Sequence, residues 1–90
     1  MWQAGIHEGD ILVVDRSLQA VHHSIIVASI AGELTVRRFY LHGGAVQLKA
    51  EHPRFPLLTV TPAMHFSVWG VVTWVLHTVA SSQPQDYDGR

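Results

Sequence analysis

The sequence predicts one small domain of the mainly β class, built from several antiparallel strands and hairpins with at most one short helical turn. Short runs of β-branched and aliphatic residues lie between turn-forming residues, and no stretch shows a convincing helical period. The chain of 90 residues is 48% hydrophobic and 14% charged, which excludes a disordered protein. We expect the domain to span residues 1–80, and the polar, aperiodic residues 81–90 to form a disordered tail.

The first half of the chain predicts three strands. Ile11–Val14 lies between the turn formers Gly9-Asp10 and Asp15, and it is typical of a buried strand. Ser24–Ile30 and Glu33–Leu41 are separated by two residues with glycine second, the pattern of an antiparallel hairpin. Residues 2–6 are too few to establish a helical turn on their own.

A second hairpin follows the first. The glycines of the 42–44 break precede Ala45–Ala50, which alternates apolar and polar residues like a half-exposed strand. Prolines then interrupt the chain, so Leu57–Thr61 is expected to be only a short strand at an edge of the sheet.

The most apolar segment is Phe66–Val79. It is longer than an ordinary strand, and we expect a bend or bulge at Gly70. Strict alternation puts Trp69 and Trp74 on opposite faces, so one fills the core and the other lies at an interface; packing of both in the core is an equal alternative. The predicted faces are Phe66, Val68, Val72, Trp74 and Leu76 on one side and Trp69, Val71, Val75 and Val79 on the other.

Composition excludes several classes of function. The net charge is −1 and the six basic residues are scattered except for the pair Arg37-Arg38, so no electrostatic footprint for nucleic acid is visible. Without cysteine there is neither a disulfide framework nor a thiolate metal site. No apolar run approaches the roughly 20 residues of a membrane-spanning helix, and we expect a cytoplasmic protein that does not contact a membrane.

The polar residues predict no metal and no cofactor. The chain has seven histidines, but no pair follows a metal-binding spacing, and surface histidines are the ordinary interpretation. His22-His23-Ser24 with Asp10 or Asp15 supplies the residue types of a Ser-His-Asp triad. Neighbouring strand residues point to opposite faces, so a polar loop is the better interpretation.

Several motifs together carry a family resemblance, which extends from Met1 to about Val79. They are Gly5-Ile6-x-x-Gly9-Asp10, Val14-Asp15-Arg16, Ile26-Val27-Ala28, Gly32-Glu33-x-Thr35-Val36-Arg37-Arg38 and Gly70-Val71-Val72. In order and spacing the chain resembles the C-terminal domain of the LexA/UmuD family of self-cleaving peptidases, family S24, and Ala20-x-His22 makes it more similar to the UmuD branch.

The resemblance implies a LexA/signal-peptidase-like β-ribbon fold and a role in the SOS response to DNA damage. Members of the family cut their own N-terminal segment when a RecA filament forms on damaged DNA. Trimmed UmuD-like proteins then dimerise and join UmuC, a subunit of an error-prone DNA polymerase.

The sequence departs from the family at both catalytic positions. Met1 matches the methionine that directly follows the family's serine, and Arg37 stands where the family has its lysine base. A buried lysine can lose its proton near neutral pH, whereas a guanidinium keeps its proton in proteins. The resemblance therefore implies no intact catalytic residue, and Arg38 cannot replace the base because it points to the other face of the strand.

Two surfaces follow from the resemblance. A cleft for an extended peptide would be bordered by Glu33, Thr35, Arg37 and Phe39, which share one strand face; an ordinary solvated face is the slightly preferred interpretation. A dimer interface would use Phe66, Val68, Trp69, Val71 and Trp74.

Three hypotheses about function result. The first is a UmuD-like partner domain without self-cleavage, and the second is a truncated Ser/Lys peptidase whose nucleophile lies upstream of Met1. A nonfunctional fragment that still folds is the weakest of the three.

Overall fold

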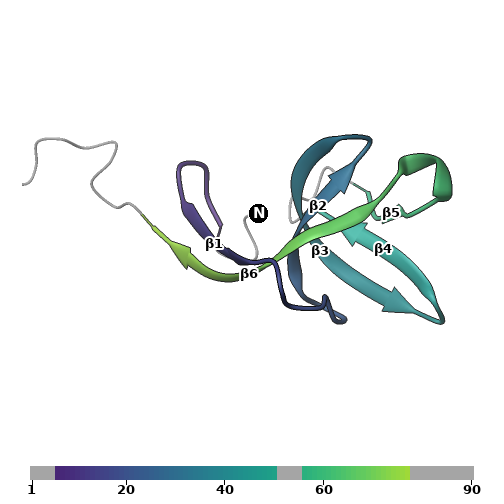
Figure 1. Ribbon diagram of the computed structural model, residues 1–90, viewed down its shortest axis with the longest axis horizontal. Helices are drawn as coiled ribbons and strands as arrows, with labels where there is room; N and C mark the ends of the chain where they lie inside the picture. Colours follow the sequence, from purple (N-terminus) through teal and green to yellow (C-terminus); the bar gives the residue numbers. More distant parts are fainter. Residues whose placement is uncertain (1–5, 51–55, 78–90) are drawn as a thin grey trace, which may run out of the picture.

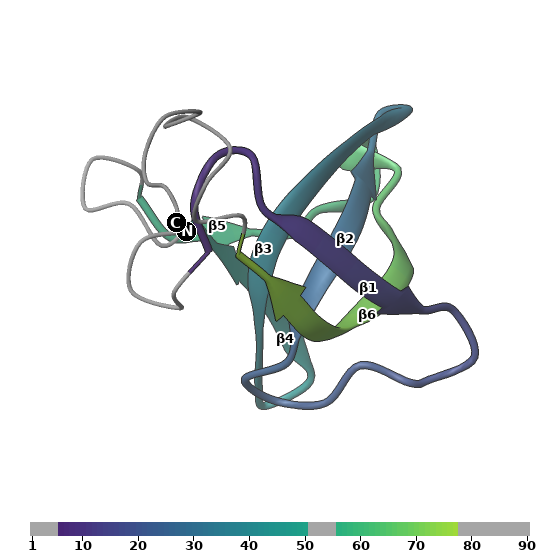
Figure 2. The ribbon, with the colours of Figure 1, turned by 90° about the vertical axis from the view of Figure 1, so that its left-hand side faces the viewer.

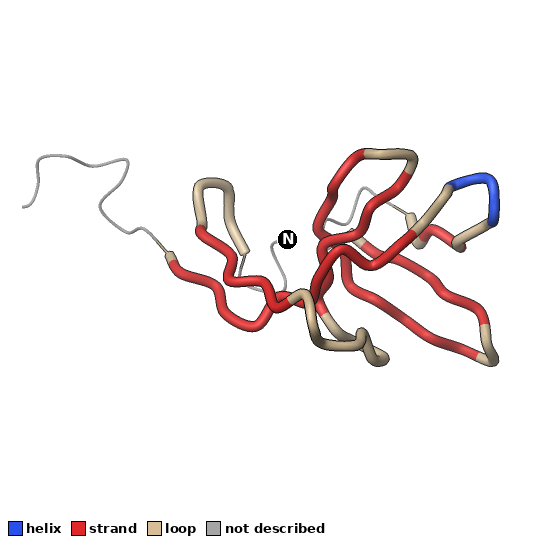
Figure 3. Tube along the Cα trace, viewed as in Figure 1, coloured by secondary structure: helices blue, strands red, loops and turns tan. Residues whose placement is uncertain are grey.

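Six antiparallel strands form a single sheet in the computed structural model, which describes residues 6–50 and 56–77 (Figure 1). The strands are β1 (Ile11–Asp15), β2 (Ile25–Ile30), β3 (Glu33–His42), β4 (Ala45–Lys49), β5 (Leu58–Thr59) and β6 (Ser67–Leu76). Their order across the sheet is β1-β6-β2-β3-β4-β5. Within the described residues, the only helical element is one 3-10 turn, Pro62–Met64 (Figure 3), so the predicted mainly β class is confirmed.

Both predicted hairpins are present, and local turn chemistry explains them. Ala31 and Gly32 have φ of 50° and 87°, the two positive values that a tight turn between twisted strands requires. β2 and β3 pair in register from Ile25 opposite Arg38 to Ile30 opposite Glu33. The short strand predicted before Pro62 is also confirmed, because β5 has two residues and lies at the edge of the sheet.

β6 organises the sheet, since its first half pairs with β2 and its second half with β1. Two bulges interrupt it. Val27 faces Gly70 but Ala28 faces Val68, which leaves Trp69 as an extra residue directly before the glycine where a bulge was predicted. The second bulge, at Thr73, was not predicted.

The bulges correct the predicted faces of this strand. Val71 lies opposite Ile26 and Val68 opposite Ala28, so both valines are on one face, although strict alternation separates them. The extra residue at Thr73 shifts the alternation once more, so that Trp74 shares that face with Val71. The alternation predicted from the sequence is therefore wrong between the two bulges.

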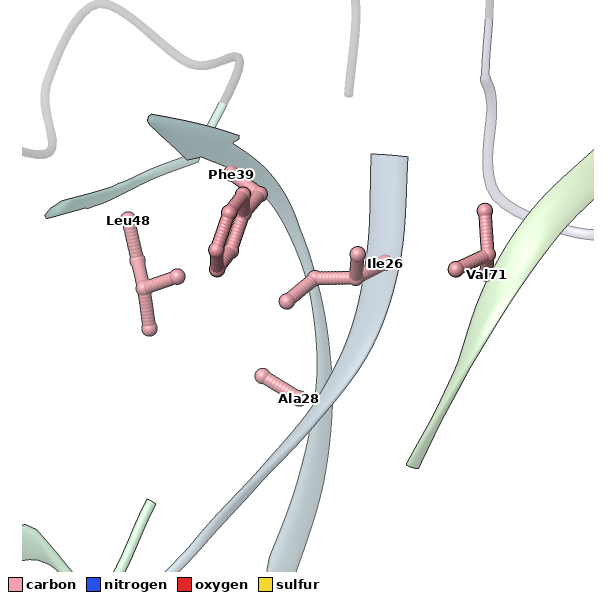
Figure 4. Packing of buried hydrophobic residues seen from close by; sticks show 5 residues of the cluster. All are labelled: Ile26, Ala28, Phe39, Leu48 and Val71. Carbon is pink, nitrogen blue, oxygen red and sulfur yellow. The ribbon is translucent and has the colours of Figure 1, made fainter. Parts of the chain in front are cut away.

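The core lies on one face of the curled sheet. Its buried cluster is Ile26, Ala28, Phe39, Leu48 and Val71, and Figure 4 shows the Ile26 side chain between Phe39 and Val71. Ile26 and Leu48 are completely buried. Because its members come from four strands, with Ile26 and Ala28 both on β2, this cluster holds β2, β3, β4 and β6 together.

Beyond Val71, β6 leaves the body of the sheet. Residues 72–76 pair with β1, and these two strand segments, Ile11–Val14 and Val72–Leu76, form what we call the β1–β6 ribbon. It extends away from the remaining strands (Figure 1), and the end view shows β1 and β6 side by side (Figure 2). In the part of the chain that the structure describes, no helix is long and apolar enough to cross a membrane.

Four expectations fall outside the described residues or remain untested. The surroundings of Met1 and most of the possible helical turn at 2–6 are not described, nor is the segment 81–90. The domain limits of 1–80 stay a prediction.

Candidate functional site

Arg37, which the resemblance aligns with the family's lysine base, lies in the middle of β3 directly opposite Ile26. Its side chain is half-buried, and Nη1 donates a hydrogen bond to the Val36 carbonyl at 2.8 Å. The register places this side chain on the same sheet face as the core. A guanidinium in this position can donate hydrogen bonds or bind an anion, but it cannot accept a proton from a hydroxyl.

The predicted peptide-cleft residues share one face, as expected, but they differ in exposure. Glu33 is exposed, Thr35 is half-buried, and Phe39 is a member of the core cluster. Phe39 is therefore fixed by packing. Most of the exposed surface of this set therefore belongs to Glu33, Thr35 and Arg37.

A surface hollow of about 320 Å³ adjoins Phe39. Leu18 and Ala20, from the loop after β1, form one side, and Val46 and Val68 contribute to the other. The sequence did not reveal this hollow, because nothing local in residues 16–20 indicates that the loop folds beside β4 and β6.

The predicted dimer-interface residues separate into a buried and an exposed group. Val71 belongs to the core, and Phe66 and Val68 pack against it. Trp69 is half-buried, with the Arg16 guanidinium 4.2 Å from its ring centre and Arg16 Nε donating to the Trp69 carbonyl at 2.9 Å. Trp74 is 69% exposed and is the member of this set that offers a large free surface.

Trp74 is part of a larger apolar surface. Ile11 pairs with Leu76 and Val13 with Trp74, so the four side chains occupy one face of the β1–β6 ribbon, and all four are exposed. We call these four residues the ribbon patch. The sequence predicted Ile11–Val14 as a buried strand, and the structure corrects this, because Ile11 is 57% exposed.

The structure uses the residues of the possible triad for local structure instead. Asp15 accepts hydrogen bonds from the backbone and hydroxyl of Ser17, and the hydroxyl bond is the main reason why the pKa of this carboxyl lies below its usual value. Ser24 Oγ accepts the Val21 N–H at 3.0 Å, and His22 Nδ1 accepts the Leu41 N–H at 2.9 Å. These contacts support a polar loop, as preferred from the sequence.

Histidines gather in two places. His22 contacts the rings of His23 and His42, with centroids 3.9 and 4.8 Å away, and all three lie around Tyr40. Burial, followed by the charges of the two neighbouring histidines, lowers the pKa of His22 from 6.5.

The second gathering is at the end of the ribbon. Asp10 Oδ2 accepts the His7 backbone N–H at 2.7 Å and lies 2.8 Å from His77 Nδ1. The pKa of Asp10 lies below its usual value, chiefly because of the His7 backbone N–H and further because of the His77 side chain. Spacing rules could not find this group, because His77 comes from the opposite end of the domain.

Comparison with known proteins places the chain in a class. A sequence profile of the family described as Peptidase S24-like matches residues 1–73. The chain therefore belongs to the peptidase S24-like family, and the resemblance inferred from its motifs is confirmed.

Particular relatives are repressors and a MucA protein. The LexA repressor of Bordetella avium (strain 197N) is 39% identical over 80 residues, which are 89% of this chain and 38% of the repressor. The LexA repressor of Paracidovorax citrulli (strain AAC00-1) is 37% identical over 76 residues, 84% of this chain and 34% of the repressor. Protein MucA of Salmonella typhimurium is 46% identical over 69 residues, 76% of this chain and 47% of MucA. The chain thus spans less than half the length of each of these relatives.

Proposed function

We propose that the chain is a UmuD-like accessory domain of the cytoplasmic SOS response, which forms a homodimer, binds an error-prone DNA polymerase subunit of the UmuC type and does not cleave itself. The observation that carries this proposal is the ribbon patch, an exposed apolar surface on a two-stranded projection. Similarity to MucA and to the LexA repressors supports the SOS role.

The ribbon patch has the composition of an association surface. Trp74 lies at its centre beside Val13, with Ile11 and Leu76 as the next cross-strand pair. Tryptophan is enriched among residues that contribute most to binding energy, and burial of apolar area is worth roughly 25 cal/mol per Å². A two-fold axis would place this patch against its copy, so that each apolar face covers the other.

Sedimentation at micromolar concentration tests the dimer. We expect the unmodified chain to sediment as a dimer, and Trp74→Ser and Leu76→Ser to shift it toward the monomer. Leu34→Ser is the matched control, because Leu34 is 55% exposed but lies in the β2–β3 hairpin, outside the patch. A chain that is strictly monomeric, or a Leu34 variant that dissociates equally, would contradict this interface.

The absence of self-cleavage is inferred from Arg37. A Ser/Lys peptidase requires a neutral amine to accept the hydroxyl proton, and the donor-only guanidinium cannot provide one. Its hydrogen bond to the Val36 carbonyl is an arrangement suited to structure rather than to proton transfer.

The polymerase partner and the RecA filament are proposed from the family alone. A tagged chain expressed together with a UmuC-like subunit should retain that subunit through size-exclusion chromatography. If both proteins are folded and soluble but do not elute together, the proposed UmuC-type partner is contradicted. The proposed dimer is not affected by that result.

A truncated self-cleaving peptidase is the alternative. The observation that favours it is the family match itself, because the family that matches residues 1–73 is described as Peptidase S24-like. The two candidates differ in whether a chain with Arg37 can cut itself.

A further inference from the structure

Three metal-ligating side chains meet at the open end of the β1–β6 ribbon. His7 and Asp10 come from the turn that precedes β1, and His77 directly follows β6. One ligand atom from each of the three lies within 4.8 Å of the others. The pairing explains why they meet: Ile11 is opposite Leu76, so Asp10 and His77 occupy the next positions outward on the two strands.

We propose that His7, Asp10 and His77 bind a divalent transition-metal ion, with Zn²⁺ as the best-fitting ion, and that the bound ion cross-links the two strands of the ribbon. This inference does not depend on the proposed SOS function or on dimerisation.

The donor atoms select the kind of ion. Two imidazoles and one carboxylate suit zinc and its first-row neighbours, whereas magnesium and calcium prefer oxygen donors alone. Three protein ligands with water as the fourth is a common zinc arrangement.

The distances are close to those of a coordinated ion. Zinc lies about 2.0–2.2 Å from nitrogen and oxygen ligands, so tetrahedral donor atoms are roughly 3.3 Å apart. The measured separations from Asp10 Oδ2 are 2.8 Å to His77 Nδ1 and 3.9 Å to His7 Nδ1, one on each side of that value. Both imidazoles are about half exposed, at 49%, and can move the remaining distance by small rotations.

The carboxylate is already held in place. Its side chain is only 6% exposed, and the His7 backbone N–H donates to Oδ2 while the Asp10 N–H donates to the His7 carbonyl at 3.1 Å. This turn presents the first two ligands together before the ion arrives, which lowers the ordering cost of binding. The third ligand comes from the other strand, so binding depends on the folded ribbon.

Binding would stabilise the ribbon. An isolated two-stranded ribbon is marginally stable in water, and an ion that binds only the folded pairing shifts the equilibrium toward it. The cross-link would lie next to Ile11 and Leu76, the outermost pair of the ribbon patch.

Zn²⁺ titration of the chelator-treated, untagged chain tests the site. Calorimetry should give one ion per chain, and NMR should show shifts in the imidazole signals of His7 and His77 and in the Ile11 and Leu76 methyls. His77→Gln is the main variant, because it lies beyond the end of β6. The affinity of this variant for zinc should fall by more than roughly 10–100-fold, which is the cost of losing a residue that only hydrogen-bonds to a metal ligand.

His42→Gln is the matched control, since it removes one imidazole from the separate histidine group around Tyr40. Its zinc affinity should equal that of the unmodified chain. The proposal would be overturned if zinc did not bind, if His77→Gln bound it with undiminished affinity, or if His42→Gln lost binding to the same extent. Asp10→Asn is a second variant that should also lose zinc affinity. A near-native NMR spectrum of this variant would establish that the loss of binding is not caused by unfolding.

Discussion

Arg37 combines a fixed place in its strand with a side chain that cannot accept a proton. The residue stays on the core-facing side of β3, opposite Ile26, and its guanidinium satisfies the Val36 carbonyl. The long aliphatic stem of arginine packs much as that of lysine does, so we expect the fold to be the same with either residue at this position. Proton acceptance does not survive it, because the guanidinium has no lone pair to offer at physiological pH.

The lowered pKa of His22 predicts that the stability of the domain depends on pH. Burial, with the charges of His23 and His42, holds the folded-state pKa of His22 below 6.5. As the pH falls, His22 becomes protonated in the unfolded chain before it does in the folded chain. The contribution of neutral His22 to the free energy of unfolding is therefore fully present above about pH 6.5, and it is lost as the pH falls through the folded-state pKa. We expect His22→Gln to flatten the dependence of unfolding free energy on pH below about pH 6.5.

NMR titration of the His22 ring and urea unfolding at several pH values measure this effect. His42→Gln removes one neighbouring charge and should raise the pKa of His22 toward 6.5. A His22 ring that titrates at or above 6.5 in the unmodified chain would contradict the prediction.

At the scale of elements, β6 determines the architecture because it joins the body of the sheet to the ribbon. Its bulges at Trp69 and Thr73 change its direction and set which side chains reach the core. Between them, Gly70 approaches β1 so closely that an added Cβ would overlap Val14 Cγ1. The glycine is required by this contact, not by its φ angle.

Gly70→Ala should destabilise the protein by about 1–3 kcal/mol, the usual cost of overpacking. In a Val14→Ala background the same change should cost markedly less, because the overlapping methyl group is gone. Chemical unfolding of the four proteins in this double-mutant cycle measures the coupling. Additive effects of the two substitutions would show that the close contact is not responsible.

The sequence predicted those elements that local chemistry determines. The Ala31-Gly32 turn and the alternation in residues 45–49 indicate their hairpins without information from elsewhere. The order of the strands, the Thr73 bulge and the exposure of Ile11 depend on contacts between distant segments. The same limit applies to the candidate sites: Arg37 was found by its motif, whereas His7, Asp10 and His77 become neighbours only when the first and last strands pair.

For the molecule as a whole, a small core supports a comparatively large apolar surface. Two completely buried side chains, Ile26 and Leu48, anchor the cluster, while the ribbon patch remains exposed. A chain of 90 residues can bury only a small core, so its free energy of unfolding is expected to be small. Covering the ribbon patch in a dimer, or cross-linking the ribbon with a metal ion, would therefore increase a small free energy of unfolding.

Leu48→Ala should lower the unfolding free energy by about 2–5 kcal/mol, because it opens a cavity at the centre of the core. Leu58 is its cross-strand partner in β5 and is 40% exposed, so Leu58→Ala is a matched control with a clearly smaller expected loss. Thermal or urea unfolding compares the two. Equal losses would contradict the assignment of Leu48 to the core.

Self-cleavage gives the most direct test that this S24-family domain binds but does not cut. The chain is extended at its N-terminus by a cleavage-site segment that ends in serine directly before Met1, and it is incubated with RecA, single-stranded DNA and nucleotide. We predict that mass spectrometry finds the Arg37 chain intact and the Arg37→Lys chain cut, because only lysine can act as the base. Cleavage of the chain that retains Arg37 would contradict the account.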